Sequence, residues 1–261
     1  MNRIKQLFDN KGDKKLLSIY FTAGYPHRDS TIELAKLLET SGADFLEIGF
    51  PYSDPVADGP VIQHSSEEAL KNGMSLDLLF DQLSELRKEV QIPVLLMGYV
   101  NPILQYGVEK FCQACATVGV DGIIVPDLPM YEYEELYQET FKKYDISNIF
   151  LVTPQTSDER IRKIDEMSTG FIYMVSSYAT TGKNLVISEQ TTHYFQRVKA
   201  LNLRSPLVVG FGIADEVSFN HALQYADAAI VGSAFVRLLS RENYLEQIPP
   251  FIGRIKGNVI A

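Results

Sequence analysis

The chain has 261 residues, 46% of them hydrophobic and 22% charged, and its 24 basic and 33 acidic side chains give a net charge of −9. A chain of this length buries roughly three quarters of its surface on folding, so it needs no disulfide or metal staple. The acidic balance and the lack of a basic run exclude nucleic acid and anionic membrane surfaces as expected partners. Residues 1–15 contain no continuous apolar segment, and we expect a cytoplasmic protein.

Short apolar runs alternate along the chain with longer segments whose apolar residues recur at helical spacing. Eight such units are typical of one parallel (β/α)8 barrel. We therefore predict a single-domain (β/α)8 TIM barrel over residues 1–261, with a short N-terminal helix at 3–8 that closes its bottom. The expected strands are 16–22, 44–50, 92–98, 122–125, 148–153, 171–176, 207–210 and 228–232. The expected helices are 30–41, 61–71, 76–90, 110–118, 133–144, 158–167, 188–201 and 215–225.

A doubly wound open sheet is the competing architecture. If it bound a dinucleotide, it would need a G-x-G-x-x-G turn after the first strand. Here the first strand runs into residues 22–26, which read TAGYP. The sequence favours the barrel, in which long loops at the carboxyl ends of the strands carry function, and the one long connection is 51–75.

Two cysteines, Cys112 and Cys115, lie three residues apart in a segment with a helical pattern. A redox pair needs an exposed thiol at a helix start, and a zinc site needs two more ligands. The four histidines are scattered and show no ligand spacing. We predict that the cysteines pack in the core and that the chain holds no metal.

Glu47 is a charged residue inside an otherwise apolar second strand. Period-2 alternation puts it on one face with Phe45 and Gly49, opposite Leu46 and Ile48. A buried carboxyl without a partner is costly, so the position has two interpretations. Glu47 is either a hydrogen-bonded core residue or an acid/base group with a raised pKa at the end of the strand.

The loop that follows carries Asp54 and Asp58 between Pro51, Pro55 and Gly59. Either aspartate alone would also suit a turn. Asp58 follows Glu47 by eleven residues, so the loop can fold back over the strand end. This arrangement places two carboxyl groups at one mouth.

Glycines end the last two strands, in residues 207–213 and 228–234. Such glycines also serve as plain turns, but they let backbone N–H groups approach a phosphate beside a helix start. Barrels often bind phosphate after strands seven and eight. Thr181 and Gly182, after the sixth strand, are expected to close a mobile lid over the same site.

The long motif at residues 46–63, LEIGFPYSDPVADGPVIQ, resembles the signature of the tryptophan synthase alpha subunit family. The resemblance continues in FTAGYP at 21–26, MGYVNP at 97–102, PDLP at 126–129 and both glycine turns. It implies a (β/α)8 lyase that cleaves indole-3-glycerol phosphate to indole and glyceraldehyde 3-phosphate in tryptophan biosynthesis, without a cofactor of its own. It also implies an alpha2-beta2 complex, in which indole passes to a beta subunit that holds pyridoxal phosphate.

By this resemblance Glu47 is the catalytic acid/base and Asp58 the carboxylate that binds the indole N–H. Asp54 is a candidate contact with the beta subunit. One departure is Ala179, where the family usually has glycine in the sixth loop, so lid closure is expected to differ. The other substrate-binding candidates are Tyr20, Met97, Tyr99, Tyr173, Thr181 and Phe211, and the phosphate-binding candidates are Gly182, Gly212, Gly232 and Ser233.

Two rival functions deserve comparison. A non-catalytic barrel could bind a phosphate ligand and only activate its partner, but it would have no need of both carboxyl groups. A Schiff-base aldolase needs a lysine on an inner strand face, and the expected strands contain none.

Overall fold

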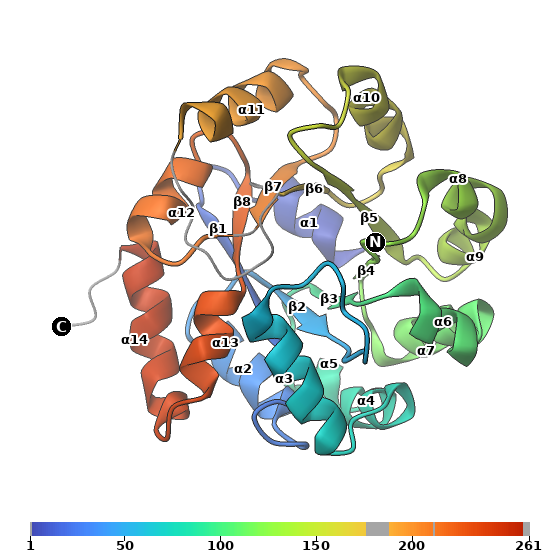
Figure 1. The fold of residues 1–261 in the computed structure, drawn as a ribbon, viewed down its shortest axis with the longest axis vertical. Coiled ribbons are helices and arrows are strands. Elements are labelled where there is room, and N and C mark those ends of the chain that lie inside the picture. The colour runs from blue at the N-terminus through green and yellow to red at the C-terminus, as the bar shows by residue number, and fades with distance from the viewer. Residues whose placement is uncertain (1, 176–187, 211, 258–261) are drawn as a thin grey trace.

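The computed structural model describes residues 2–175, 188–210 and 212–257 (Figure 1). Eight parallel strands close into one barrel in chain order, which confirms the predicted fold class. The strands are β1 (Leu16–Thr22), β2 (Phe45–Gly49), β3 (Val94–Met97), β4 (Gly122–Ile124), β5 (Ser147–Val152), β6 (Ile172–Val175), β7 (Leu207–Gly210) and β8 (Ala228–Val231).

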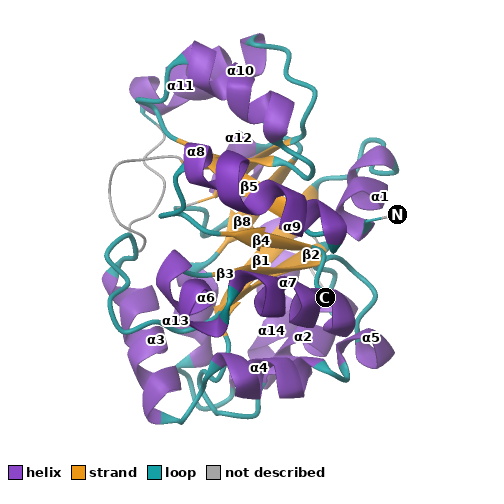
Figure 2. Cartoon of the chain, turned by 90° about the vertical axis from the view of Figure 1, so that its right-hand side faces the viewer, coloured by secondary structure: helices purple, strands orange, loops and turns teal. Residues whose placement is uncertain are grey.

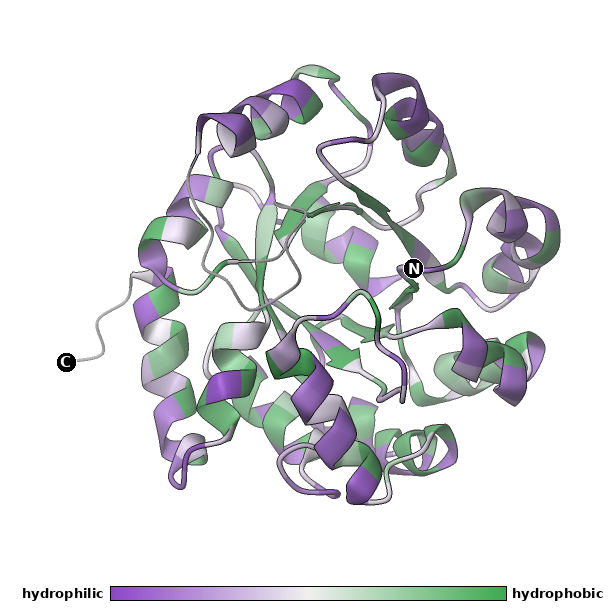
Figure 3. Ribbon diagram, in the orientation of Figure 1, coloured by the Kyte–Doolittle hydropathy of each residue, from purple (hydrophilic) through white to green (hydrophobic). Residues whose placement is uncertain are grey.

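Helices surround the barrel, and their outward faces are hydrophilic while the strands are hydrophobic (Figure 3). The first seven helices are α1 (Arg3–Asp9), α2 (Thr31–Thr40), α3 (Pro60–Lys71), α4 (Leu76–Leu83), α5 (Leu86–Glu89), α6 (Val100–Tyr106) and α7 (Val108–Val118). The next four are α8 (Met130–Glu132), the π-helical turn η1 (Tyr133–Tyr137), α9 (Gln138–Lys143) and α10 (Asp158–Met167). The last four are α11 (Glu189–Ala200), α12 (Glu216–Ala222), α13 (Ser233–Leu239) and α14 (Tyr244–Lys256).

The predicted helix at 76–90 is wrong as one element, because the chain breaks at Ser84 and Glu85 into α4 and α5. Three helices, α6, α13 and α14, were missed. Pro102 masks α6 in the sequence, yet proline is tolerated in the first turn, where its missing N–H breaks no intrahelical bond. In α14, Pro249 and Pro250 lie inside the helix, past its first turn, where each removes an intrahelical hydrogen bond, so this helix depends on its packing against the barrel.

The register of the strands determines which side chains meet inside the barrel. The paired residues can be followed from strand to strand around the closed sheet. A path that starts at Tyr20 on β1 comes back to β1 level with residue 12, so the shear of the barrel is eight residues. Each strand is therefore stepped by one residue from the next along the barrel axis. Inward side chains then stack in layers of four, contributed by alternate strands.

Three of these layers surround the functional region. The middle layer consists of Glu47, Ile124, Tyr173 and Ile230 from the even strands. The layer above it, toward the carboxyl ends of the strands, consists of Tyr20, Met97, Leu151 and Gly210 from the odd strands. The layer below consists of Ser18, Leu95, Ile149 and Val208, also from the odd strands.

Helix α1 closes the end of the barrel opposite the mouth, as predicted, and Figure 2 shows it at that end. Its Ile4 side chain is buried among inward-facing residues. The Phe8 ring lies 6.1 Å from the Phe45 ring and 5.9 Å from the Phe171 ring, measured between centroids. The bottom is therefore sealed by aromatic packing, which leaves the mouth as the end where a ligand can enter.

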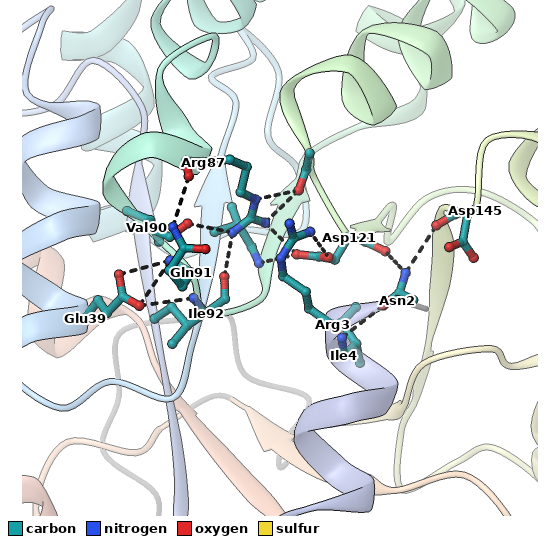
Figure 4. Close-up of polar contacts among 12 residues, drawn as sticks. Asn2, Arg3, Ile4, Glu39, Arg87, Val90, Gln91, Ile92, Asp121 and Asp145 are labelled. Carbon is teal, nitrogen blue, oxygen red and sulfur yellow. Dashed lines mark hydrogen bonds and ion pairs between the residues drawn. The ribbon is translucent and has the colours of Figure 1, made fainter.

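A polar network also ties the bottom together (Figure 4). Asp121 is almost fully buried, and its Oδ2 accepts from Arg87 Nη2 at 2.6 Å and from the Val94 N–H at 2.9 Å. Its Oδ1 accepts from Arg3 Nη1 at 3.1 Å. Arg87 also donates to the Gly119, Val90 and Ile92 carbonyls. The network thus joins α1, α5, β3 and the start of β4.

We expect Asp121→Asn to lower the free energy of unfolding by about 2 kcal/mol, because the amide cannot accept all three charge-assisted bonds. Urea titration followed by circular dichroism measures the change. Glu85→Gln is the matched control, since its ion pair with Lys88 is exposed and contributes little. Equal losses in the two variants would contradict the structural role of Asp121.

Candidate active site

Glu47 lies in the middle layer of the barrel with its side chain fully buried. Within the described residues, neither carboxyl oxygen has a hydrogen-bond partner. Burial raises the pKa of Glu47 to about 8. Of the two interpretations of this residue, the hydrogen-bonded core glutamate therefore fails, and Glu47 is a buried carboxylic acid that carries its proton at neutral pH.

Asp58 sits above Glu47's strand end, on the loop between β2 and α3. Tyr99 Oη donates to Asp58 Oδ2 at 3.0 Å, and the same hydroxyl accepts from the Ala57 N–H at 3.0 Å. Burial raises the pKa of Asp58 to about 6, partly offset by the hydrogen bond from Tyr99. At neutral pH the site therefore holds one ionised carboxylate and one protonated carboxyl group.

Two phenols lie near the carboxyl groups, Tyr173 buried and Tyr20 partly buried. The pKa of Tyr20 is raised by burial and then by the negative charges of Asp58 and Glu47. The pKa of Tyr173 is raised by burial and then by Glu47 and Asp58. Each phenol is therefore close enough to both carboxyl groups for their charges to raise its pKa. With Tyr99, which donates to Asp58, the structure brings together five residues that the sequence had suggested separately.

Two glycines leave the space that these phenols occupy. A Cβ atom on Gly49 would lie 2.2 Å from Tyr20 Oη, and one on Gly210 would lie 2.0 Å from Tyr173 Oη. Sequence reasoning took Gly210 as part of a phosphate turn and gave Gly49 no role. Their contribution is visible only when neighbouring strands are paired, because each glycine faces a ring from the adjacent strand.

A cavity opens at the mouth beside Asp58. Of the predicted substrate-binding residues, Tyr20, Met97 and Tyr99 line it, whereas Phe211 lies outside the described residues. Tyr52, which sequence reasoning missed, packs on Tyr99 with ring centroids 5.3 Å apart. The remaining lining residues are Phe50, Pro55, Ser66, Gly98 and Pro126. This wall is largely aromatic and apolar, with one carboxylate, a composition that matches a flat ring with an N–H group. The space between these side chains in this structure is about 10 Å³, room for one water molecule, so an indole ring would enter only after they move apart.

The predicted phosphate residues are described only in part. Gly212 follows β7 with φ +79°, a conformation that favours glycine. Gly232 follows β8 and precedes α13, whose first residue is Ser233. A Cβ on Gly232 would lie 3.7 Å from the Tyr20 side chain, so this turn adjoins the carboxyl cluster. Thr181 and Gly182, with Ala179, lie outside the described residues.

Exposed apolar side chains rim one side of the mouth. Val56 is 82% exposed, Leu104 47% and Tyr131 63%. They lie on the segments that follow β2, β3 and β4, and exposed Asp54 shares a loop with Val56. Sequence reasoning found Asp54 but missed the apolar residues, since only the fold shows that these three segments follow adjacent strands.

Other chemistry finds little support. Cys112 and Cys115 are free and buried, and burial raises the pKa of Cys112 to about 12, which confirms their place in the core. The described ranges bring together no group of three or more side chains suited to a metal ion. In the part of the chain that is described, no helix is long and apolar enough to cross a membrane.

The fold and the site together are those of a barrel enzyme, with two carboxyl groups, Glu47 on β2 and Asp58 on the loop that follows it, gathered toward the carboxyl ends of the strands, where barrel enzymes carry their active sites. The family model of the tryptophan synthase alpha chain matches residues 7–248. The chain belongs to this family. It accordingly cleaves indole-3-glycerol phosphate in tryptophan biosynthesis, as a lyase that uses no cofactor.

Individual relatives agree over nearly the whole length. The tryptophan synthase alpha chain of Flavobacterium psychrophilum is 53% identical over 255 residues, covering 98% of this chain and 100% of the relative. That of Christiangramia forsetii is 55% identical over 257 residues, covering 98% and 99%. A Legionella pneumophila tryptophan synthase alpha subunit structure matches with TM-score 0.89 and 33% identity, covering 99% and 98%. A Mycobacterium tuberculosis tryptophan synthase structure in an aminoacrylate-bound form matches with TM-score 0.86 and 30% identity, covering 99% and 100%.

Proposed function

We propose that the reaction takes place at the barrel mouth, with Glu47 as the acid/base and Asp58 as the group that holds the indole N–H. The observation that carries this proposal is a pair of carboxyl groups in different surroundings: Glu47 is fully buried without a hydrogen-bond partner among the described residues, and Asp58 accepts a hydrogen bond from Tyr99. Burial raises the pKa of Glu47 to about 8 and that of Asp58 to about 6. Cleavage needs both an acid for carbon and an anion for the ring nitrogen. One site can supply an acid and an anion together when the surroundings of its two carboxyl groups give them different pKa values.

In the first step Glu47 gives its proton to indole C3. The ring becomes a cation whose charge is largest at the nitrogen, and the Asp58 carboxylate accepts a hydrogen bond from that N–H. Burial favours this step, since a carboxylic acid with pKa near 8 is neutral and ready to donate. Tyr99 keeps Asp58 in position through its bond to the Ala57 N–H.

In the second step Glu47, now a carboxylate, takes the proton from the glycerol hydroxyl next to the ring. The carbon–carbon bond between C3 and that carbinol carbon breaks, and its electrons return to the ring. The carbinol carbon becomes the aldehyde of glyceraldehyde 3-phosphate, and indole is released. Glu47 ends protonated, so the step regenerates the catalyst without an external proton.

The phosphate of the substrate is assigned to the turns after β7 and β8. Gly212, Gly232 and the N–H groups at the start of α13 are the described candidates, with Ser233 as a hydroxyl donor. Thr181 and Gly182 complete the proposed set. This placement sets the indole ring on the β2 and β3 side of the mouth, against Met97 and Tyr99.

The pH dependence of cleavage tests the assignment of the two carboxyl groups. Asp58 must be ionised and Glu47 protonated, so kcat/KM should be maximal between about pH 6 and about pH 8 and fall on both sides. Initial rates of indole release across this range measure it. A profile without an alkaline limb would contradict the role of Glu47 as the initial acid.

We further propose that the mouth docks a tryptophan synthase beta subunit, in an alpha2-beta2 complex where indole passes to pyridoxal phosphate on the partner. The apolar side chains of Val56, Leu104 and Tyr131 support this placement, because exposed apolar groups around an active-site mouth are typical of a protein interface. Asp54 lies within the same rim and offers a charge to a basic partner residue.

A charge placed in this rim should weaken docking. We expect Val56→Asp to reduce affinity for the beta subunit at least about tenfold, because the new carboxylate would lose its water on binding. Titration calorimetry against the purified beta subunit measures the change. Val217→Asp is the control, since Val217 is 68% exposed on α12, across the barrel from α6 and α8 (Figure 1). Equal weakening by both variants would contradict docking at this rim.

A further inference from the structure

Ser18 is a polar residue in the interior of the barrel with no evident purpose in the proposed reaction. It faces inward from β1, in the layer directly below Glu47, and its side chain is fully buried. The other three members of that layer, Leu95, Ile149 and Val208, are apolar. Within the described residues its hydroxyl has no hydrogen-bond partner.

The shear of the barrel puts Glu47 between two hydroxyl groups of the neighbouring strand. Tyr20 lies one step above Glu47 along the barrel axis, and Ser18 lies one step below. Both therefore lie on β1 next to the strand position of Glu47. In this structure the Ser18 hydroxyl and the Glu47 carboxyl group are not hydrogen-bonded to each other, so a contact between them requires a change of side-chain rotamer. A buried hydroxyl and a buried carboxyl that both lack partners cost free energy unless they meet each other or a ligand.

The hydroxyl above is already engaged. Tyr20 Oη lies 3.4 Å from Thr22 Oγ1, which lies 2.7 Å from Ser65 Oγ. Ser65 Oγ in turn donates to the Ile62 carbonyl at 2.8 Å. Ser18 has no such chain, so of the two flanking hydroxyls it is the one still open to Glu47.

We propose that Ser18 is a positioning residue for Glu47, whose hydroxyl accepts a hydrogen bond from the protonated carboxyl group and donates one to the carboxylate formed when the proton goes to indole. The inference rests on the proposed role of Glu47. A serine hydroxyl suits both states because it can donate or accept by rotating one bond.

The surroundings make such a donor important. The titratable groups around Glu47 are Tyr20 on β1, Tyr173 on β6 and Asp58 on the loop above. The inward residues of β3, β4 and β8 in these layers are apolar and carry no charge. The carboxylate formed in the first step therefore meets no cation among the described residues of these layers, and hydroxyl donors must stabilise it.

Ser18→Ala tests the proposal through the pH profile of indole release. Loss of a donor to the carboxylate should raise the pKa of Glu47 and move the alkaline limb of kcat/KM upward by about one pH unit. We expect kcat to fall about tenfold with little change in KM, since the bond strengthens as charge forms. Ser18→Thr, which keeps the hydroxyl, should restore the wild-type limb.

A second measurement does not depend on catalysis. The carbonyl stretch of the protonated Glu47 carboxyl can be assigned in the infrared spectrum of the free chain by its loss in Glu47→Gln. In Ser18→Ala this band should move to higher frequency, as expected for a carboxyl group that has lost a hydrogen bond. The band should return in Ser18→Thr.

A buried serine with only a packing role gives a different pattern. Ser18→Ala would then be more stable, because an unpaired buried hydroxyl is removed, while the alkaline limb and the infrared band would stay in place. That result would overturn the proposal. If the wild-type chain released no indole, the proposed site would fail, and the infrared band alone would decide whether Ser18 contacts Glu47.

Discussion

Glu47→Gln is expected to lower the rate of indole release by about 10²- to 10⁴-fold, the usual contribution of a positioned acid/base group. Glutamine has the same shape but carries no transferable proton, so C3 protonation would depend on water. The measurement is kcat for cleavage of indole-3-glycerol phosphate by the purified variant. A rate within threefold of the wild type would contradict the role of Glu47 as the acid/base.

The variant should fold normally, which separates a catalytic loss from a structural one. The pKa of Glu47 is raised from 4.5 to about 8 in the folded chain, so the folded state holds a proton that the unfolded state releases. Stability therefore falls as pH rises between these values. Glu47→Gln removes that cost, and its melting temperature should match or exceed the wild type, most clearly near pH 8. Glu85→Gln, at an exposed position, is the activity control.

Asp58→Asn is expected to lower kcat by about 10²- to 10³-fold, the usual loss when one electrostatic contact to the transition state is removed. The amide oxygen can still accept from Tyr99 and from the indole N–H, so the shape of the site and the KM should change little. What is lost is the negative charge that offsets the cation formed on the ring. Stopped-flow or steady-state measurement of indole release gives the value.

Two further results would distinguish charge from geometry at Asp58. The acid limb near pH 6 should disappear in Asp58→Asn, because the group that titrates there is gone. Asp77→Asn changes an exposed carboxylate at the start of α4 and should leave the profile unaltered. A persistent acid limb in Asp58→Asn would assign that titration to another residue.

Local patterns predicted the strands well because each strand is short, apolar and bounded by turn residues. The bounds of β1 and β7 agree fully with expectation, and α10 was predicted residue for residue. No helix was predicted over α6 or α14, and both carry proline near the start or within the helix, where it weakens the local helical pattern. These helices form because packing against the rest of the barrel stabilises them, although their local sequence is only weakly helical.

The site illustrates the limit of local reasoning more closely. Period-2 alternation put Glu47 on one face of its strand with Phe45 and Gly49, and the structure shows that this face points into the barrel. The family resemblance made Tyr99 a substrate-binding candidate, and the structure shows in addition that its hydroxyl donates to Asp58. That contact joins loops after two different strands, and no single-strand pattern reports it.

The sequence alone also could not predict which side chains share a layer inside the barrel. Which residues lie above and below Glu47 depends on the shear of the closed sheet, and shear is set by the pairing of strands far apart in the chain. The places of Ser18 and Tyr20 beside Glu47, and the space that Gly210 leaves for Tyr173, emerge only from that pairing.

The most direct test of the central claim is to measure both products released from indole-3-glycerol phosphate by the purified chain with no added cofactor. The account predicts indole and glyceraldehyde 3-phosphate in equal molar amounts, with or without a beta subunit to accelerate release. Products formed only after a cofactor is added, or none even in the presence of the beta subunit, would contradict a site in which the carboxyl groups of this barrel carry out the cleavage.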